Sequence, residues 1–350
     1  MSAGRDLSIG IAGWGRAGGE LHARALRGLA GARIAAVADC DARARARAAG
    51  VVGPERVFDD PRRLLEDPSL DAIALCMPVR GRAPIALEAL AGGRPLFIEK
   101  PLALSLEESD RLVAAAARMG GCTMVGMNLR WHAQARRAKA RIAAGGIGEV
   151  DLIRSTLTSW HDEVPEWRQR RSSGGGVLFE MAVHHVDLWR WLTGLEVVDV
   201  HAWTRSGTWD DESAVVNARL TGGALATAVL GERSVADNEI ELFGRRGSVA
   251  LSFYRFDGLR HRATGGVPGD LGARRAAAGE AIRGLAHLAR ARLDGGTWLE
   301  TYRAEWRHFI DCVRRGVAPE STFADGAKAL AVVLAAVDSA RSGRPQAVAR

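Results

Sequence analysis

Short, continuously apolar runs alternate with amphipathic stretches over the first 125 residues of the chain. Such runs are typical of strands that are buried on both faces of a sheet. We expect five of them, at Leu7–Ala12, Arg33–Ala38, Ala72–Met77, Pro95–Ile98 and Cys122–Met127. The stretches between them have helical spacing, as in Ala17–Leu29, Ile85–Ala91 and a helix that begins at Ser105. This alternation predicts a doubly wound parallel sheet with helices on both faces.

The pattern changes after Asn128, where longer strands alternate between apolar and polar positions. We expect these strands at Glu149–Thr158, Val197–Trp203, Ala214–Leu220, Ala224–Leu230, Glu239–Phe243 and Ser248–Phe253. Short turns between them, such as 221–223, predict a large and mostly antiparallel sheet. Helices are expected from about Gln134, over Val177–Leu192 and over Phe323–Ser342. Residues 258–298 are rich in glycine and arginine and predict a variable excursion with a weak helix near 278–292.

The two patterns predict two domains, an α/β domain over residues 1–125 and an α+β domain over residues 126–350. A chain of 350 residues is long enough for both. With 47% hydrophobic and 25% charged residues, the composition is typical of a soluble globular protein. The apolar run Ala329–Val337 is much shorter than the ~20 residues that a membrane span needs. Asp6 and the glycines near the N-terminus do not fit a secretory signal, so we expect a cytoplasmic protein without a membrane segment.

The charge balance is 48 basic against 41 acidic residues, or +7. The densest basic stretches, 43–47 and 136–141, alternate with alanine like solvated helix faces, so we expect no nucleic-acid partner. The four cysteines have no metal-ligand spacing, which predicts reduced core residues and no metal site. Only Lys100, Lys139 and Lys328 are lysines. Because lysine can give up its proton and arginine cannot, each lysine is a candidate for chemistry.

Residues Gly13–Gly18 read G-x-G-x-x-G, between the first predicted strand and the first predicted helix. In that context the motif indicates a dinucleotide-binding turn. The first glycine permits a tight turn, the second lets the backbone approach a pyrophosphate, and the third lets the helix pack on the sheet. A merely structural turn is the alternative.

Asp39 ends the second predicted strand, where an acid accepts hydrogen bonds from the adenosine ribose hydroxyls and repels a 2′-phosphate. Together with Cys40 this favours NAD over NADP, although Arg43 lies close enough to weaken the preference. Asp39 can also be interpreted as a helix N-cap, which is compatible with ribose binding.

The fourth predicted strand runs into Glu99–Lys100–Pro101, and ligands gather at the carboxyl ends of parallel strands. There Lys100 can stabilise charge that develops on a substrate oxygen. A surface lysine paired with Glu99 is the alternative.

Three glycines, at 174–176, precede a helix on which Glu180 and His184 share a face with Asp187. A carboxylate and an imidazole one turn apart can orient each other for proton transfer. An acid near a helix N-terminus and a satisfied histidine are the alternative, and His185 is expected to be structural.

Taken together, these motifs resemble the Gfo/Idh/MocA oxidoreductases, which include inositol, glucose and other sugar dehydrogenases. The resemblance rests on the glycine turn with His22, on Asp39, on Glu99–Lys100–Pro101 and on the glycine-led helix with His184, and it runs from about residue 7 to 350. It implies an NAD(P)-binding Rossmann domain over residues 1–125, followed by a substrate-binding and oligomerisation domain. It also implies a sugar-like or polyol-like substrate and a homodimer or homotetramer.

The family's catalytic lysine corresponds to Lys100, its acid–base histidine to His184 and its partner aspartate to Glu180. The glycine motif and the resemblance together imply cofactor contacts from Gly13, Trp14, Gly15, Arg16, Ala17, Asp39, Met77, Pro78, Arg82, Glu99, Lys100 and Asn128. The implied substrate contacts come from Arg130, Trp167, Arg168, Glu180 and His184.

Three positions depart from the family pattern. Glu180 replaces an aspartate and carries its carboxylate one methylene further out. Ala182 stands where glycine is common. Arg82 stands where a histidine usually follows the Met77–Pro78 turn, and it could place a cation beside the cofactor or a substrate phosphate.

Our leading hypothesis is an NAD(H)-dependent dehydrogenase or reductase that acts on a secondary alcohol or ketone of a sugar, cyclitol or glycoside. Redox-neutral glycosidase or lyase chemistry with tightly held NAD, and a non-catalytic cofactor-binding protein, are the alternatives.

Overall fold

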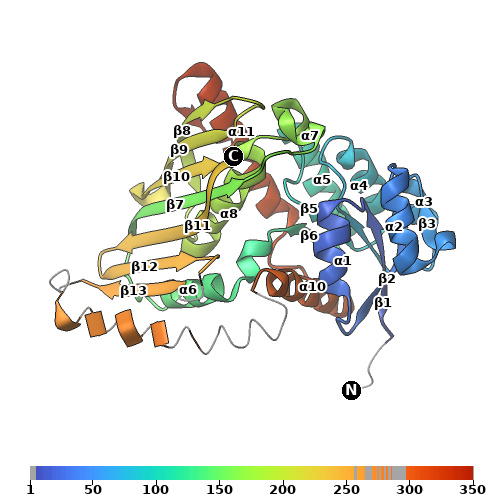
Figure 1. The fold of residues 1–350 in the computed structure, drawn as a ribbon, viewed down its shortest axis with the longest axis horizontal. Helices are drawn as coiled ribbons and strands as arrows, with labels where there is room; N and C mark the ends of the chain where they lie inside the picture. Colours follow the sequence, from blue (N-terminus) through green and yellow to red (C-terminus); the bar gives the residue numbers. More distant parts are fainter. Residues whose placement is uncertain are drawn as a thin grey trace. The chain divides into compact units, whose positions relative to one another are not determined.

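A computed structural model describes residues 5–255, 258–264 and 297–349, together with short pieces between residues 270 and 285. The chain folds into two compact units (Figure 1). One unit comprises Met1–Asn128 and Trp298–Leu330, and the other comprises Leu129–Thr297 and Ala331–Arg350. Each unit contains one sheet.

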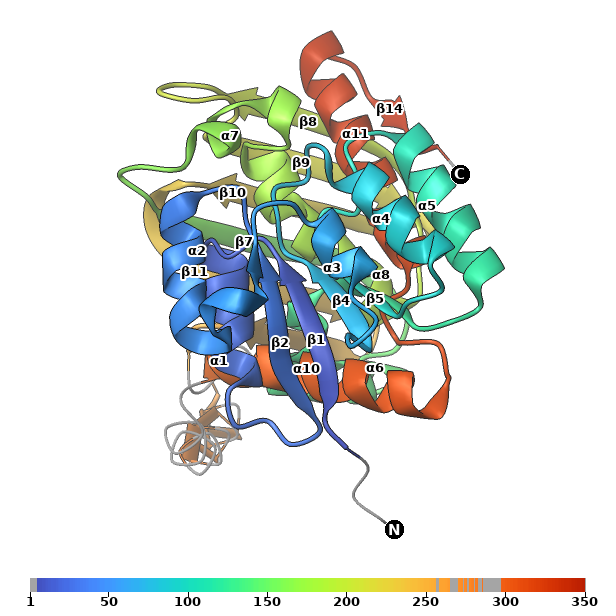
Figure 2. The same ribbon diagram turned by 90° about the vertical axis from the view of Figure 1, so that its right-hand side faces the viewer.

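The first unit contains a six-stranded, all-parallel sheet in the order β3-β2-β1-β4-β5-β6. Its strands are β1 (Leu7–Ala12), β2 (Ala32–Ala38), β3 (Val57–Phe58), β4 (Ala72–Leu75), β5 (Leu96–Glu99) and β6 (Thr123–Gly126). Figure 2 shows β2, β1, β4 and β5 side by side. The doubly wound parallel sheet is therefore confirmed. The short edge strand β3 is an addition to the five predicted strands.

Helical segments connect these strands. They are η1 (Arg16–His22), α1 (Ala23–Leu26), α2 (Ala42–Val52), η2 (Pro54–Arg56), α3 (Arg62–Glu66), α4 (Arg82–Ala91) and α5 (Leu106–Met119). Ser105 caps α5 by accepting a hydrogen bond from the N–H of Glu108 (3.1 Å), and the Glu108 carboxylate accepts one from the N–H of Leu104 (3.1 Å). These reciprocal bonds fix the start of the helix at the serine that the sequence predicted.

A long helix that the sequence analysis did not predict, α10 (Thr297–Arg315), belongs to the first unit from Trp298 onward. Its Trp306 ring stacks on Phe97 of β5 with ring centroids 5.0 Å apart, and Phe309 meets the same ring edge-on at 5.8 Å. The predicted boundary at residue 125 and the observed units therefore differ over residues 298–330, and also over the three residues 126–128. The reason for the larger difference is that the chain returns to the first sheet through aromatic packing that adjacency in sequence does not reveal.

The second unit is built on an eight-stranded sheet in the order β13-β12-β11-β7-β10-β9-β8-β14. Its strands are β7 (Val150–Trp160), β8 (Val197–Arg205), β9 (Ser213–Leu220), β10 (Leu225–Gly231), β11 (Arg233–Gly244), β12 (Gly247–Ser252), β13 (Leu259–Ala263) and β14 (Gln346–Ala347). Among the strands that the structure describes in this sheet, only the β7–β10 pair is parallel, so the predicted mostly antiparallel sheet is confirmed. β13 and β14 are additions at its two edges, and most of the helix predicted near 278–292 lies outside the described residues.

The helical segments of the second unit are η3 (Asn128–Trp131), whose first residue belongs to the first unit, α6 (Ala133–Ala143), α7 (Glu166–Gln169), η4 (Arg171–Ser173), η5 (Leu178–Ala182), α8 (Val183–Thr193) and η6 (Thr221–Gly223). A last helix, α11 (Phe323–Ser342), begins in the first unit and ends in the second. α8 packs on β7, and α6 packs on β12 and α8, so these helices cover one face of the sheet (Figure 1).

The other face of this sheet exposes apolar side chains in cross-strand rows. Leu152 pairs with Leu225, and Val215 lies between Trp203 and Val229. Each of these five side chains is at least 38% exposed. We call them the apolar rows.

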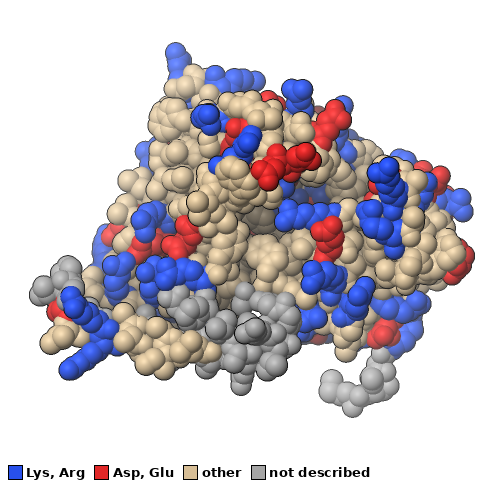
Figure 3. Space-filling model, in the orientation of Figure 1, with Lys and Arg blue, Asp and Glu red and all other residues tan. Residues whose placement is uncertain are grey.

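Charged side chains of both signs are interspersed over the face drawn in Figure 3. No helix among the described residues is both long and apolar enough to span a bilayer. All four cysteines are reduced, but Cys40 is exposed. The prediction that it is a core residue is wrong, because it follows a strand end and does not lie within the strand.

Candidate active site

The glycine turn Gly13–Gly18 lies at the carboxyl end of β1, and each glycine has a distinct reason to be there. Gly13 has φ +92°, and a Cβ on it would lie 2.5 Å from the main-chain nitrogen of Met77. A Cβ on Gly18 would lie 1.9 Å from the carbonyl oxygen of Gly13. At exposed Gly15, by contrast, an added Cβ would meet no described heavy atom within 4 Å. The first and third glycines are thus required by the fold, and the second keeps a space clear beside the backbone.

Asp39, at the end of β2, is tied to this turn by its carboxylate. One oxygen accepts a hydrogen bond from the N–H of Trp14 (2.6 Å), and the other accepts one from the N–H of Asp41 (2.8 Å). The interpretation of Asp39 as a helix N-cap is wrong, because Asp41 caps α2 through the N–H of Arg43. Each carboxylate oxygen of Asp39 can accept a further bond. The turn, the clear space at Gly15 and this half-buried acid fit a dinucleotide with a ribose diol.

The turns after β4 and β5 are held together by Arg82, the first residue of α4. Its guanidinium donates hydrogen bonds to the main-chain oxygens of Met77 (3.3 Å) and Pro101. The residue is only 2% exposed. That Arg82 places a cation beside the cofactor or a substrate phosphate stays a prediction. Its guanidinium bonds the turns after β4 and β5, and the second of these contains Lys100.

Lys100 follows the last residue of β5 and is half-buried. Its N–H donates to Oε2 of Glu99 (3.0 Å), while Oε1 of Glu99 lies 2.7 Å from Nε2 of His22. Burial alone would raise the pKa of the Glu99 carboxyl. The hydrogen bond with His22, together with the charges of Lys100 and Arg82 nearby, lowers it overall. Glu99 is thus held as a carboxylate beside the candidate catalytic lysine.

In the second unit, one helix carries the candidate acid–base pair. From Val177 to Leu192 every residue is buried except Glu180 and His184, which are partly exposed. Glu180 lies in η5 and His184 at the start of α8. His185 is fully buried 3.0 Å from the side-chain oxygen of Asn238, and burial lowers its pKa to about 4. A helix buried on every other side therefore presents one carboxylate and one imidazole, and His185 is structural as predicted.

Arg168 of α7 connects Glu180 to a second carboxyl group. Its Nε lies 3.6 Å from Glu180, and its Nη2 donates to Glu232, which is fully buried. Glu232 also accepts a hydrogen bond from Nε1 of Trp209 (3.1 Å). Burial raises the pKa of Glu232, and Arg168 only partly opposes this. The guanidinium charge is thus matched by two carboxyl groups.

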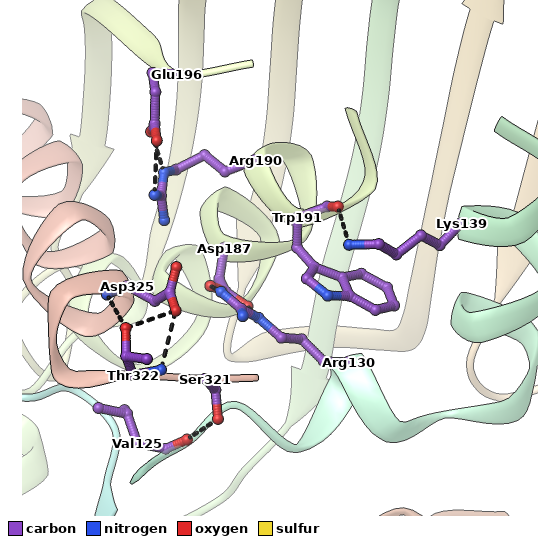
Figure 4. A network of polar contacts seen from close by, with 10 residues as sticks. All are labelled: Val125, Arg130, Lys139, Asp187, Arg190, Trp191, Glu196, Ser321, Thr322 and Asp325. Atoms are coloured by element: carbon purple, nitrogen blue, oxygen red, sulfur yellow. Dashed lines mark hydrogen bonds and ion pairs between the residues drawn. The ribbon is translucent and has the colours of Figure 1, made fainter. Parts of the chain in front are cut away.

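Arg130, predicted to bind substrate, lies instead in a buried pair with Asp187 of α8 (Figure 4). Its Nε donates to Asp187 at 2.7 Å, its Nη2 donates to the other carboxylate oxygen, and both side chains are at most 3% exposed. This geometry indicates a structural role for Arg130. Figure 4 also shows Arg190 bonded to Glu196, and Lys139 bonded to the main-chain oxygen of Trp191 (2.9 Å).

The remaining predicted residues have simpler surroundings. Arg16 and Pro78 are exposed, while Ala17, Met77 and Trp167 are half-buried. Asn128 is 2% exposed, and its Nδ2 has no hydrogen-bond partner among the described residues. Such a buried donor is suited to an acceptor on a bound ligand.

The structure thus gathers the predicted residues into two groups, each within one unit. The glycine turn, Asp39, Met77 and Lys100 lie at the carboxyl edge of the first sheet, and Glu180, His184 and Arg168 lie in the second unit. The sequence analysis missed Glu232, Trp209 and Trp306. The spacing of Tyr302, Trp306 and Phe309 could have indicated the buried face of α10, whereas no local pattern marks Glu232.

A parallel sheet with this glycine turn defines a Rossmann dinucleotide-binding domain. Comparisons with known proteins agree. The family model described as the oxidoreductase family with an NAD-binding Rossmann fold, Gfo/Idh/MocA, matches residues 7–127, and the model of the Gfo/Idh/MocA C-terminal domain matches residues 135–250. The chain belongs to the Gfo/Idh/MocA family and is an oxidoreductase, as its motifs indicated.

Relatives and solved structures cover almost the whole chain. The chain is 30% identical to inositol 2-dehydrogenase of Rubrobacter xylanophilus, over 98% of this chain and 93% of that protein. It is 28% identical to the NAD⁺-dependent scyllo-inositol 2-dehydrogenase of Bacillus subtilis, over 97% and 96%. The fold matches that of the WlbA dehydrogenase of Bordetella pertussis, solved with NADH and UDP-GlcNAcA, with a TM-score of 0.83, 22% identity and 99% of each chain covered.

Proposed function

We propose that this protein is an NAD(H)-dependent dehydrogenase that interconverts a secondary alcohol and a ketone on a neutral cyclitol or sugar. The observation that carries the proposal is the helix Val177–Leu192, on which Glu180 and His184 alone are partly exposed. The names of the inositol dehydrogenases among its relatives support a polyhydroxylated substrate.

The Rossmann unit would hold the cofactor. Gly15 leaves room for the pyrophosphate, Asp39 accepts hydrogen bonds from the ribose hydroxyls, and the buried Nδ2–H of Asn128 donates to the cofactor. The acid at Asp39 favours NAD over NADP, because a 2′-phosphate beside a carboxylate is repelled. When bound, the nicotinamide supplies the hydride acceptor or donor.

The protein's own residues handle the substrate oxygen and its proton. In the oxidation direction, His184 takes the hydroxyl proton, and the Lys100 ammonium stabilises the negative charge that develops on the oxygen. Glu180 orients the imidazole or accepts a bond from a neighbouring hydroxyl. In ketone reduction the same residues act in the reverse direction, with His184 returning the proton to the substrate oxygen.

The pairing of Arg168 supports a neutral substrate. Because Glu180 and Glu232 both contact the guanidinium, its positive charge already has partners within the protein and is not an open anchor for a substrate carboxylate or phosphate. The carboxylate of Glu180 would also repel an anionic group placed beside it.

The apolar rows support self-association. Monomers rarely expose large apolar patches, and the apolar rows place five exposed valine, leucine and tryptophan side chains on one face of the sheet. We infer that two copies of the chain cover these rows in a homodimer or homotetramer.

The test is a panel of inositols, neutral sugars and sugar acids, assayed with NAD and NADP in parallel. The proposal expects reduced-nicotinamide absorbance to change at 340 nm with a neutral polyol and NAD. Turnover of a glycoside with no net absorbance change would indicate redox-neutral chemistry. Cofactor binding with no turnover on any member of the panel would contradict the proposed dehydrogenase.

A further inference from the structure

A chain of buried hydrogen bonds runs from α10 to the backbone of Lys100, entirely within the first unit. Nε1 of Trp306 donates to Nδ1 of His22 (3.1 Å). Nε2 of His22 lies 2.7 Å from Oε1 of Glu99, and Oε2 of Glu99 accepts the N–H of Lys100 (3.0 Å). Trp306 and His22 are both 0% exposed, so water does not compete for the two bonds of His22, whereas the bond from Lys100 to Glu99 is partly buried.

The donors and acceptors in this series of hydrogen bonds can be assigned, because an indole N–H can only donate. Nδ1 of His22 must therefore accept, which places the ring proton on Nε2, facing Glu99. Burial alone would lower the pKa of His22, but Cys76 and Glu99 beside the ring raise it overall. A second ring proton on Nδ1 would nevertheless face the Trp306 N–H, so the neutral ring satisfies both bonds.

Aromatic rings hold this histidine from several sides. Phe97 and Tyr302 meet the His22 ring edge-on, each with ring centroids 5.2 Å apart, and Trp306 is itself stacked on Phe97. The low-polarity surroundings strengthen each bond of the chain and make a broken one costly.

Glu305, one residue before Trp306, is also 0% exposed, and neither of its carboxyl oxygens bonds another described residue. Burial raises its pKa well above the ordinary range. A neutral Glu305 leaves the Glu99 carboxylate as the anion of this cluster, directly beside Lys100.

We propose that His22 and Trp306 are positioning residues for Lys100. They hold the Glu99 carboxylate in one orientation. In that orientation the carboxylate accepts the main-chain N–H of Lys100 and places a negative charge beside the Lys100 amine. Neither residue needs to touch the substrate. The proposal rests on the proposed function only for its effect on turnover, since the placement of Lys100 can be measured without a substrate.

The central variant is Trp306→Phe, which removes the donor but keeps an aromatic ring against Phe97. Its matched control is Tyr302→Phe, which deletes a hydroxyl from the same aromatic cluster without touching any of the three bonds. With the substrate found in the panel, Trp306→Phe should lower kcat roughly 5- to 50-fold, the range expected when a buried acceptor loses its donor. NADH affinity should stay within about 2-fold, as it should in the control.

The substrate-independent readout uses the scarcity of lysine. Reductive methylation with ¹³C-formaldehyde labels Lys100, Lys139, Lys328 and the N-terminal amine, and a Lys100→Arg sample assigns the Lys100 resonance. That resonance should move in Trp306→Phe and in His22→Gln, while the resonances of the other two lysines stay in place. Tyr302→Phe should move none of them.

An unmoved Lys100 resonance in a folded Trp306→Phe protein, checked by its circular dichroism and melting temperature, would overturn the proposal. If Trp306→Phe does not fold, His22→Gln decides by the same criterion. If the wild-type protein turns over no polyol while the resonance moves as expected, the proposed function fails and the positioning role stands.

Discussion

Nε of Arg168 lies 3.6 Å from the carboxylate of Glu180, and the same guanidinium donates to the buried Glu232. The extra methylene of Glu180, relative to the family's usual aspartate, thus carries its carboxylate to a fixed cation. Shortening it in Glu180→Asp should lower kcat/KM about 10-fold or more, because the carboxylate would lose that pair. NADH affinity should not change. An unaltered kcat/KM on the best substrate of the panel would show that Arg168 does not position Glu180.

The proposed function places Lys100 at the substrate oxygen, so Lys100→Met should remove most of the turnover while leaving NADH binding intact. Loss of an electrostatic stabiliser of this kind costs about 10²- to 10³-fold in kcat. Fluorescence titration with NADH and steady-state kinetics measure the two effects. Lys328→Met, at an exposed position on α11, is the control and should retain wild-type kinetics. Comparable rates in the two variants would contradict the assignment.

Asp39 accepts the Trp14 N–H and is expected to repel a 2′-phosphate. Asp39→Asn keeps the shape of the side chain but removes the charge, so the ratio of kcat/KM for NAD to that for NADP should fall, by roughly 10-fold. Parallel assays with the two cofactors measure it. The matched control is Asp41→Asn, at the cap of α2. A ratio that falls equally in both variants would point to a general loss of negative charge.

The pair Arg130–Asp187 predicts a stability effect and no direct effect on catalysis. Arg130→Met would leave Asp187 as a buried, unmatched carboxylate and should cost about 3–5 kcal/mol of unfolding free energy. Urea unfolding curves measure this cost. The double variant Arg130→Met/Asp187→Leu should recover much of the loss, because it also removes the stranded charge. If Arg130→Met is as stable as the wild-type protein but binds substrate less well, Arg130 has the substrate-binding role that the sequence predicted.

Burial of His185 predicts a loss of stability in mild acid. Its pKa is about 4 in the folded protein, against an ordinary value of about 6.5, so the unfolded chain takes up the proton first as pH falls. The contribution is complete above pH ~6.5 and declines between ~6.5 and ~4, by about 2 kcal/mol at pH 5. Urea unfolding at pH 7 and pH 5 measures it. The unfolding free energy of His185→Gln should depend less on pH than that of the wild-type protein. An equal pH dependence in the two proteins would show that His185 is not the cause.

Much of the fold was predictable because its signals are local. The buried strands of the first sheet and the helix after Gly174–Gly176 follow from periodicity and glycine placement. The α10 helix was missed, although Trp306 and Phe309 have helical spacing, because nothing in the neighbouring sequence shows that they pack against Phe97 of β5.

The candidate site was less predictable, because the role of a charged residue depends on partners that lie far from it in the sequence. Arg130 matches a position that often lines the family's cleft, yet it pairs with Asp187. Arg82 was expected to place a cation beside the cofactor or a phosphate, yet it bonds two main-chain turns. Glu232 lies 64 positions from Arg168, and no spacing rule connects them. Lys100 and His184 could be singled out only because each sits in a recognisable motif.

The burial of every residue but two between Val177 and Leu192 limits how this enzyme can be engineered. Substitutions along that helix would disrupt the packing of the interior before they changed substrate specificity. Altered specificity is therefore best sought by diversifying α7 and the environment of Glu232, which adjust the acid–base pair from outside and leave its scaffold untouched.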